Sequence, residues 1–339
     1  MWKSLIVFFS LIVACSATCD PLGEAYNGSY PLTPPFVKGN EITYRWAMIA
    51  DYGQRYGDKY RSEMKFGTLT INTKTLTINF DFEKNKRTVQ TIFAANGFGA
   101  QFADLSVFNG RLYTCDRSTG IVYEVVNPGL LVPWLILANG NGRRHHTGFP
   151  CRWMTVKGTK MFIGSDGLTR KVRGREINDN RQWVKQVSVG GIVDQTHWSR
   201  FYRQLMQAVQ PPLTRQQRLK HEAVVYDRYT QQWTFLPHVV PLTPKTKHNI
   251  LLRADNYFSL IKYIPLKLTR FNRFFTSVKI IPGLKNLPKG VTGVAVGIRV
   301  QQDQKDPQTT IVAFALPTGI ILRNDTWIDS NAFTGFEFV

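Results

Sequence analysis

Two histidine-containing pairs have side chains that could bind a transition metal, but neither has the spacing that such a site needs. His145 and His146 are adjacent in an arginine-rich loop, a setting typical of solvent-exposed histidines. His221-Glu222 lacks the second histidine, four residues from the first, that a zinc protease places on one helix face. No serine with an evident histidine and aspartate partner stands out, and the glycine-rich residues 140–142 are too few for a phosphate-binding loop. Spacing alone therefore predicts neither a zinc enzyme nor a serine hydrolase.

The chain is strongly basic, with 43 Lys and Arg against 23 Asp and Glu and a net charge of +20. A field of this sign attracts polyanions such as nucleotides, DNA, heparin-like glycans or polyphosphate. The simpler interpretation is solubility with non-specific attraction. The basic residues are spread along the sequence, so they form no compact nucleic-acid-reading motif.

Residues 1–17 have the form of a secretory signal peptide. Lys3 precedes an apolar run over residues 5–14, and three small residues follow it. That run is too short to span a bilayer, and no later segment reaches the roughly 18 apolar residues of a transmembrane helix. We therefore expect a secreted, extracellular protein without a membrane anchor. Loss of Lys3 lowers the net charge from +20 to +19.

The cysteines and two N-glycosylation sequons can be compared with this predicted extracellular location. Cleavage leaves Cys19, Cys115 and Cys151, an odd number for an oxidising environment. Cys115 and Cys151 can form a disulfide if their strands are neighbours, with Cys19 then free or joined to another chain, but the sequence does not establish that geometry. The sequons at Asn27 and Asn324 fit glycosylated surface loops, and they are equally consistent with chance matches.

Short β-rich runs separated by turn signals fill most of the chain. One unit recurs, an apolar strand, a tight polar turn and a strand with an aromatic residue, at residues 105–113, 153–163 and 224–235. Such units suggest blades of a β-propeller, although the repeat alone does not exclude a β-sandwich. Only residues 198–209 have apolar side chains at helical spacing.

Several short sequence motifs, called words below, resemble those of one family in their order and spacing. Residues 148–157 read Gly-Phe-Pro-Cys-Arg-Trp-Met-Thr-Val-Lys and resemble the Gly-Phe-x-x-Glu-Trp-x-x-x-Lys segment of the secreted calcium-activated nucleotidases, which include the salivary apyrases of bed bugs and sand flies. Further words resemble that family at residues 49–51, 65–69, 104–120, 133–137, 221–223 and 333–338. No single word would suffice, but together they cover residues 42–339.

This resemblance implies a five-bladed β-propeller formed by a single domain over residues 41–339, after an irregular lead-in at 18–40. It also implies a calcium ion in the central tunnel, held by oxygen groups from successive blades beside the nucleotide phosphates and the attacking water. The implied activity is hydrolysis of extracellular ADP and ATP. In the saliva of a blood feeder, this would oppose platelet aggregation and haemostasis.

The family's calcium positions are poorly retained here. Glu222 keeps its carboxylate and Thr276 keeps a hydroxyl. Ala103 replaces a serine and offers only its carbonyl. Arg152 and Thr334 each replace a glutamate. Two of three calcium-binding carboxylates are therefore missing, and one has become a cation.

Neighbouring positions also change from acidic or phosphate-binding residues to neutral or basic ones. Gly53 and Arg117 replace aspartates, residues 139–142 read Asn-Gly-Asn-Gly where the family has Asp-x-Asp-Gly, and Phe98 replaces an arginine. A calcium ion about 6 Å from a fixed guanidinium is repelled by roughly 5 kcal/mol at an effective dielectric constant of about 20. Because arginine does not lose its proton, this weakens calcium binding by thousands-fold if Arg152 points into the tunnel. The penalty shrinks if Arg152 turns outward or pairs with Glu222.

Two hypotheses follow. In the first, the chain has lost efficient hydrolysis and binds nucleotides or other polyanions, with Arg117 and Arg152 as anion-binding residues. In the second, it is an active metal-dependent apyrase that converts ATP and ADP to AMP and phosphate. Its metal would lie in a remodelled site made by Asp51, Asp104, Asp116 and Glu222.

Overall fold

A computed structural model describes residues 25–127, 129–143, 145–172, 175–241, 249–269, 272–301 and 307–339. The predicted signal peptide and Cys19 lie outside these residues. The described chain is all-β apart from one α-helix, α1 (Ser199–Gln207), and one short 3₁₀ helix, η1 (Asn180–Gln182), so the helix predicted at 198–209 is confirmed. No helix in these ranges is long and apolar enough to cross a membrane.

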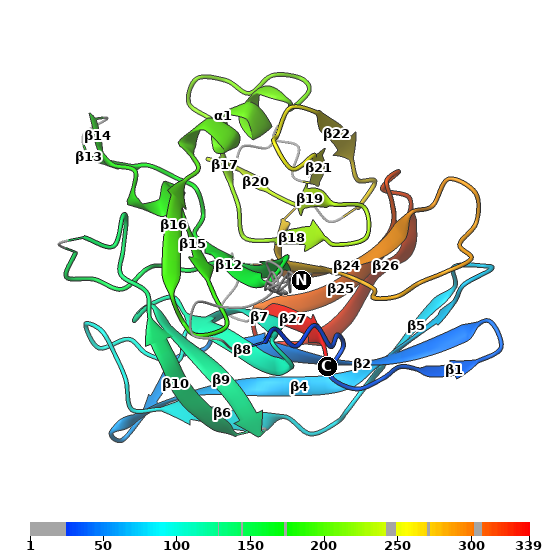
Figure 1. Cartoon of the computed structure of the whole chain (residues 1–339), viewed down its shortest axis with the longest axis horizontal. Coiled ribbons are helices and arrows are strands. Elements are labelled where there is room, and N and C mark those ends of the chain that lie inside the picture. Colours follow the sequence, from blue (N-terminus) through cyan, green and yellow to red (C-terminus); the bar gives the residue numbers. More distant parts are fainter. Residues whose placement is uncertain are drawn as a thin grey trace, which may run out of the picture.

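Four antiparallel sheets of four strands lie around a common centre in a β-propeller arrangement, each running in chain order from the centre to the rim (Figure 1). Their strands are β7 (Phe102–Phe108), β8 (Arg111–Asp116), β9 (Ile121–Asn127) and β10 (Leu130–Ile136); β11 (Trp153–Lys157), β12 (Lys160–Gly164), β15 (Trp183–Val187) and β16 (Val193–His197); β18 (Val224–Asp227), β19 (Gln232–Phe235), β21 (Ile250–Ala254) and β22 (Ile261–Pro265); and β23 (Arg273–Ile280), β24 (Gly293–Gln301), β25 (Gln308–Leu316) and β26 (Ile321–Asp329). Two small ribbons are added by β13 (Arg170–Val172) with β14 (Arg175–Asn178), and by β17 (Arg218–Lys220) with β20 (His238–Val240).

The two ends of the described chain combine in a seven-stranded sheet. It contains β1 (Phe36–Lys38), β2 (Glu41–Ala50), β3 (Gln54–Tyr56), β4 (Lys59–Asn72), β5 (Ile78–Phe82), β6 (Arg87–Thr91) and the last strand, β27 (Phe333–Phe338). β27 pairs with β2 and brings Phe338 opposite Trp46. The regular blades therefore number four rather than the predicted five, because the chain ends build a larger sheet in place of another four-stranded one. Strand β1 also falls within the lead-in that was predicted to be irregular.

The three recurring units are the innermost hairpins of three sheets. They form β7–β8, β11–β12 and β18–β19, as their strand–turn–strand pattern predicts. In the first, Asn109 and Gly110 both have positive φ, as a two-residue hairpin turn requires. All residues of β7 are buried, whereas all residues of β16 are exposed or half-buried. This gradient arises because inner strands pack between two neighbouring sheets and outer strands face solvent.

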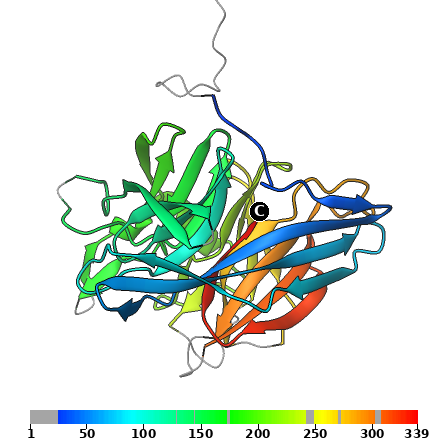
Figure 2. The same cartoon turned by 90° about the horizontal axis from the view of Figure 1, so that it is seen from below.

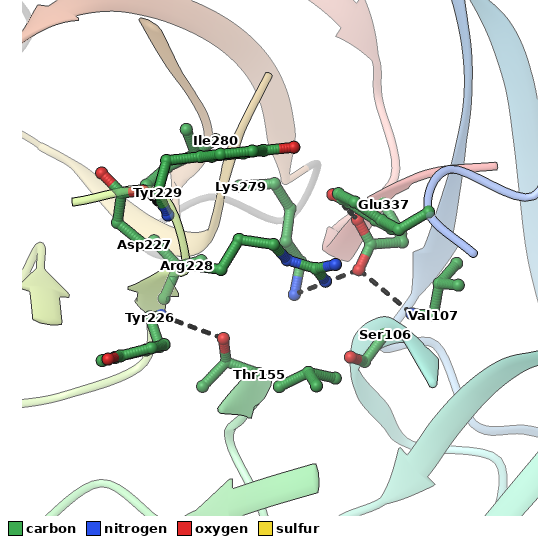
Figure 3. A pocket seen from close by; sticks show the side chains of 13 residues that line it. Ser106, Val107, Thr155, Tyr226, Asp227, Arg228, Tyr229, Lys279, Ile280 and Glu337 are labelled. Carbon is green, nitrogen blue, oxygen red and sulfur yellow. Dashed lines mark hydrogen bonds and ion pairs between the residues drawn. The ribbon is translucent and has the colours of Figure 1, made fainter. Parts of the chain in front are cut away.

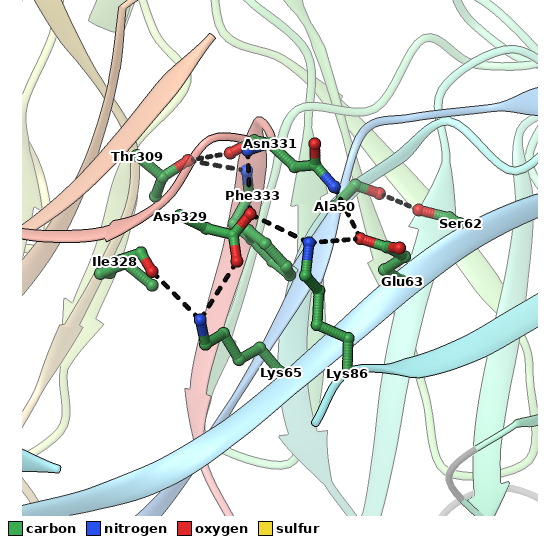
Figure 4. Close-up of polar contacts among 10 residues, drawn as sticks. All are labelled: Ala50, Ser62, Glu63, Lys65, Lys86, Thr309, Ile328, Asp329, Asn331 and Phe333. Atoms are coloured by element: carbon green, nitrogen blue, oxygen red, sulfur yellow. Dashed lines mark hydrogen bonds and ion pairs between the residues drawn. The ribbon is translucent and has the colours of Figure 1, made fainter. Parts of the chain in front are cut away.

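Ion pairs and aromatic contacts join neighbouring sheets. Lys65 and Lys86 approach the two carboxylate oxygens of Asp329 at 3.1 and 3.0 Å, and Lys86 also lies 3.1 Å from Glu63, so the end of β26 is tied to β4 (Figure 4). Trp198, at the start of α1, packs edge-on against Trp233 with ring centroids 5.1 Å apart. The apolar face of α1 therefore belongs to the core.

The segment that leads from residue 25 to β1 crosses one face of the ring beside the C-terminus (Figure 2). The hydroxyl of Tyr30 donates to Glu337 Oε1 at 2.8 Å, and Arg228 stacks over the Tyr30 ring at 4.6 Å. The chain's N-terminal part therefore covers one end of the ring centre and leaves the other end for a site.

Candidate functional site at the open end of the ring

Hydrogen bonds fix the relative heights of the innermost strands, that is, their positions along the axis of the ring. The main-chain N–H of Met154 on β11 and the hydroxyl of Ser277 on β23 both donate to the carboxylate of Asp104 on β7, at 3.0 and 2.8 Å. At the covered end, Glu337 of β27 accepts from the N–H of Val107 (Figure 3). The starts of these strands therefore share the opposite, open end.

The five positions that the resemblance links to calcium lie towards this open end; four are at or just before strand starts, and Thr276 is the fourth residue of β23. The Thr334 hydroxyl donates to the carbonyl of Phe102 at 2.7 Å. Thr276 is buried, and its hydroxyl has no hydrogen-bond partner among the described residues. Ala103 is also buried. Arg152 and Glu222 immediately precede the β11 and β18 regions and contact each other.

Arg152 forms an ion pair with Glu222 instead of turning outward. Its Nη1 lies 3.1 Å from Glu222 Oε1, and Lys220 Nζ lies 2.9 Å from the same oxygen. Burial raises the pKa of Glu222, but Arg152, Lys220 and His238 outweigh burial and lower this pKa to about 2. The one retained glutamate is therefore an anion bound to two cations.

A second ion pair lies beside the first. Arg117 Nε is 2.8 Å from Asp51 Oδ2, and Asp51 Oδ1 has no hydrogen-bond partner in the described part of the chain. Burial raises the pKa of Asp51, and the positive charges of Arg117 and then Arg152 oppose this effect. Because Glu222 also acts on Asp51, the two pairs form one coupled cluster.

A disulfide holds the two arginine-bearing segments together. Cys115 and Cys151 are bonded, with their Cα atoms 6.5 Å apart. Arg117 lies two residues after the first cysteine, and Arg152 directly follows the second. The bond therefore ties the β8–β9 turn to the start of β11 below the site.

An open pocket of about 330 Å³ lies above this cluster and is lined by three guanidinium groups, those of Arg117, Arg152 and Arg181. Asp166 and the exposed ring of Phe98 complete much of its wall. Arg181 Nη1 lies 2.9 Å from Asp166 Oδ2, and the Arg181 side chain remains 47% exposed. Fixed guanidinium groups in a concave wall present several hydrogen-bond donors to a phosphate or sulfate group.

The other predicted acidic residues do not join a common site. Asp104 is buried and accepts from the N–H groups of Leu105 and Met154, from Ser277 and from Lys279, so both its oxygens are occupied. Asp116 accepts from Ser118 through one oxygen, and its other oxygen is buried without a partner among the residues described. In the same ranges, no group of three or more His, Cys, Asp or Glu side chains is placed to hold a metal ion.

The remaining predicted residues lie at the surface or at a neighbouring groove. Asn27 and Asn324 are exposed, as glycosylation would require. His145 and His146 line a groove of about 550 Å³ that adjoins the arginine-lined pocket and shares Ala95 with it.

Sequence reasoning did not identify Lys220, Asp166 or Arg181 as site residues. A signal for Lys220 was present, since residues two apart in an extended segment point to the same side and Lys220 precedes Glu222 by two. Arg181 belongs to η1, and its approach to Asp166 depends on how the loops fold at the sheet of β11, β12, β15 and β16. No sequence pattern indicates that approach.

The low pKa of Glu222 predicts an acid-sensitive contribution to stability. The folded pKa of about 2 lies below the ordinary value of 4.5, so the stabilisation is present above about pH 4.5 and is lost as the pH falls towards 2. We expect Glu222→Gln to cost about 3 kcal/mol at neutral pH and progressively less in acid. Urea unfolding of both proteins at stepped pH measures this difference. A difference that stays constant down to pH 2 would contradict the expectation.

The fold and the site together define a β-propeller protein with a disulfide-braced, arginine-lined pocket at the open end of its ring. The family model described as Apyrase matches residues 50–339. The chain belongs to the apyrase family.

Named relatives agree with this family. The apyrase of Phlebotomus duboscqi is 29% identical over 87% of this chain and 88% of its own length. The soluble calcium-activated nucleotidase 1 of Rattus norvegicus is 30% identical over 93% of this chain and 78% of its own, and the apyrase of Cimex lectularius is 26% identical over 99% and 93%. Among solved structures, a GH43 β-1,3-galactosidase aligns over 92% of this chain at 10% identity with a TM-score of 0.39, too low to bear on function.

Proposed function

We propose that this apyrase-family protein binds nucleoside di- and triphosphates in the arginine-lined pocket without calcium and hydrolyses them weakly or not at all. The observation that carries the proposal is the contact of Arg152 with Glu222, with Lys220 on the same carboxylate oxygen. In this proposal, the guanidinium of Arg152 supplies the positive charge that the resemblance expects from calcium.

The donor set at the family's calcium positions does not fit that ion. Calcium takes six to eight oxygen ligands and favours carboxylates. Here the single carboxylate, that of Glu222, is already bound to two cations, and the Thr334 hydroxyl is directed to a main-chain carbonyl. Pairing with Glu222 reduces the repulsion that Arg152 exerts on a metal ion, but it also occupies Oε1 of the last carboxylate.

A second function, metal-dependent hydrolysis of ATP and ADP to AMP and phosphate, is favoured by a different observation. Four of the buried side-chain oxygens that lack hydrogen-bond partners among the described residues belong to predicted site residues, and polar groups in such positions are costly unless a ligand, water or ion satisfies them. They belong to Asp51, Asp116, Glu222 and Thr276. The relatives named apyrase and calcium-activated nucleotidase also support hydrolysis.

Phosphate release and calorimetry together separate these functions. We expect ADP and pyrophosphate to bind with micromolar or tighter affinity in the presence of a chelator, and phosphate release from ADP to be absent or slow with Ca²⁺, with Mg²⁺ and with chelator. Release that is rapid with a metal and abolished by chelation would establish the second function. Failure of ADP, polyphosphate and heparin to bind without calcium would refute the first.

The setting of this function is also a proposal. The apolar run at residues 5–14 and the sequons at Asn27 and Asn324 support a secreted, extracellular glycoprotein. The apyrases of a sand fly and a bed bug among the relatives support a salivary, anti-haemostatic role. The net charge of +20 supports heparin-like glycans, polyphosphate or DNA as further partners. We count the seven-stranded sheet as the counterpart of a fifth blade.

A further inference from the structure

The rim of the arginine-lined pocket carries an aromatic ring that the core does not use. Phe98 is 57% exposed and lines the pocket together with Arg117 and Arg152. It makes no ring-stacking or cation–π contact with another described residue. An aromatic side chain in the wall of a concave pocket, beside a few polar and charged groups, is a common ligand contact.

A tight turn fixes the backbone that carries this ring. Ala95 and Phe98 exchange both main-chain hydrogen bonds, at 2.8 and 3.0 Å, across a two-residue turn. The residues between them, Asn96 and Gly97, have φ of 53° and 80°, the left-handed pair that a tight hairpin turn requires. A ligand that stacks on Phe98 therefore loses little free energy to ordering the loop.

The neighbouring groove extends the aromatic surface away from the guanidinium groups. It has a volume of about 550 Å³ and shares Ala95, Asn96 and Ser118 with the arginine-lined pocket. Phe93 and Ile136, 43% and 70% exposed, line it on the side away from the arginines. The two cavities together form a continuous surface with guanidinium groups at one end and, at the other, a mixed wall in which Phe93 and Ile136 lie among polar residues such as His145 and His146.

We propose that Phe98 is the base-stacking residue of this site, so that the preferred ligand is a purine nucleotide rather than a bare polyphosphate. The phosphates lie against Arg117, Arg152 and Arg181, and the base lies on the Phe98 ring towards the neighbouring groove. This inference rests on the proposed function, because the arginines must bind the phosphates first. Phe98 stands where the family resemblance places an arginine, so the stacking surface belongs to this chain rather than to the family pattern.

Calorimetric titration of ADP, UDP and pyrophosphate in the presence of chelator tests the proposal. Phe98→Ala should weaken ADP binding about tenfold, as loss of one base–aromatic stack predicts, and leave pyrophosphate binding within about twofold. Phe98→Trp should restore ADP binding, and the unaltered protein should bind ADP several-fold more tightly than UDP. Phe36→Ala provides a matched control, because Phe36 is 69% exposed but lies on β1 away from both cavities.

The outcomes separate the stacking proposal from the proposed function. If the unaltered protein binds pyrophosphate but Phe98→Ala leaves the affinity for ADP unchanged, only the stacking proposal is overturned. An equal loss for ADP and pyrophosphate also overturns it, since that result means a damaged pocket rather than a lost base contact. If the unaltered protein binds neither ligand, the proposed function fails, and the stacking proposal fails with it.

Discussion

Replacing Lys279 by methionine should lower the free energy of unfolding by about 3–5 kcal/mol, a loss typical of a broken buried ion pair. Lys279 lies at the ring centre with its side chain only 3% exposed. Its Nζ is 3.1 Å from Asp104 Oδ2, donates to the carbonyl of Met154 at 2.9 Å and lies 3.9 Å from Glu337 Oε2 (Figure 3). Methionine keeps the volume but leaves two buried carboxylates without their cation. Urea unfolding at neutral pH measures the loss.

The acid dependence of this loss identifies its cause. Burial already raises the pKa of Asp104 and of Glu337, and Lys279 opposes both shifts. The cost of Lys279→Met should therefore shrink as the pH falls and both carboxyls take up protons. Lys262→Met, on the exposed edge strand β22, serves as a control and should change stability by less than about 0.5 kcal/mol. A loss below about 1 kcal/mol for Lys279→Met at neutral pH would contradict the role assigned to the pair.

Restoring two glutamates, in the double variant Arg152→Glu with Thr334→Glu, should tighten calcium binding at least a hundredfold. The change removes a guanidinium that repels a divalent ion by roughly 5 kcal/mol at about 6 Å and adds two anionic oxygen ligands beside Glu222. Thr334→Glu also gives up the hydrogen bond to the Phe102 carbonyl, at a cost of about 1 kcal/mol. Calcium titration by calorimetry, with thermal unfolding to verify the fold, measures the outcome.

Arg181→Glu is the matched control for this gain. It changes the charge of the same pocket by two units, as Arg152→Glu does by itself, but Arg181 is half exposed and pairs with Asp166 rather than Glu222. Its effect on calcium affinity should be small because solvent screens the charge and no ligand position is restored. If the double variant binds calcium no better than this control, the loss of carboxylates is not what limits calcium binding.

Much of the fold follows from local patterns that the sequence contains. Alternating apolar residues with a tight turn predict each inner hairpin, and Asn109-Gly110 shows how two residues specify such a turn. The helix at Ser199–Gln207 follows from the spacing of its apolar residues. The predicted number of regular blades, five, was wrong because strand β27 and the N-terminal strands share one sheet. No local pattern specifies this pairing between the chain ends.

The sequence indicated candidate site residues but not how they pair. The substitutions at Arg152 and Thr334 are visible in the sequence, and so is the retained Glu222. That Arg152 would reach the Glu222 oxygen that Lys220 also contacts, or that Asp104 would have both oxygens occupied, depends on the relative heights of neighbouring inner strands. Those heights are set by the packing of whole sheets around the ring.

The sequence by itself determined which charges the chain carries, where its hairpins lie and which family words it retains, because each of these is a property of a residue or of near neighbours. Only the tertiary structure decided which charges meet. Arg117 and Asp51 are 66 residues apart, and Lys279 and Asp104 are 175 apart, yet each pair lies about 3 Å apart across two sheets. Coulomb attraction at that range is steep, so closure of the ring, rather than the list of charged residues, decides which charges form ion pairs around the arginine-lined pocket.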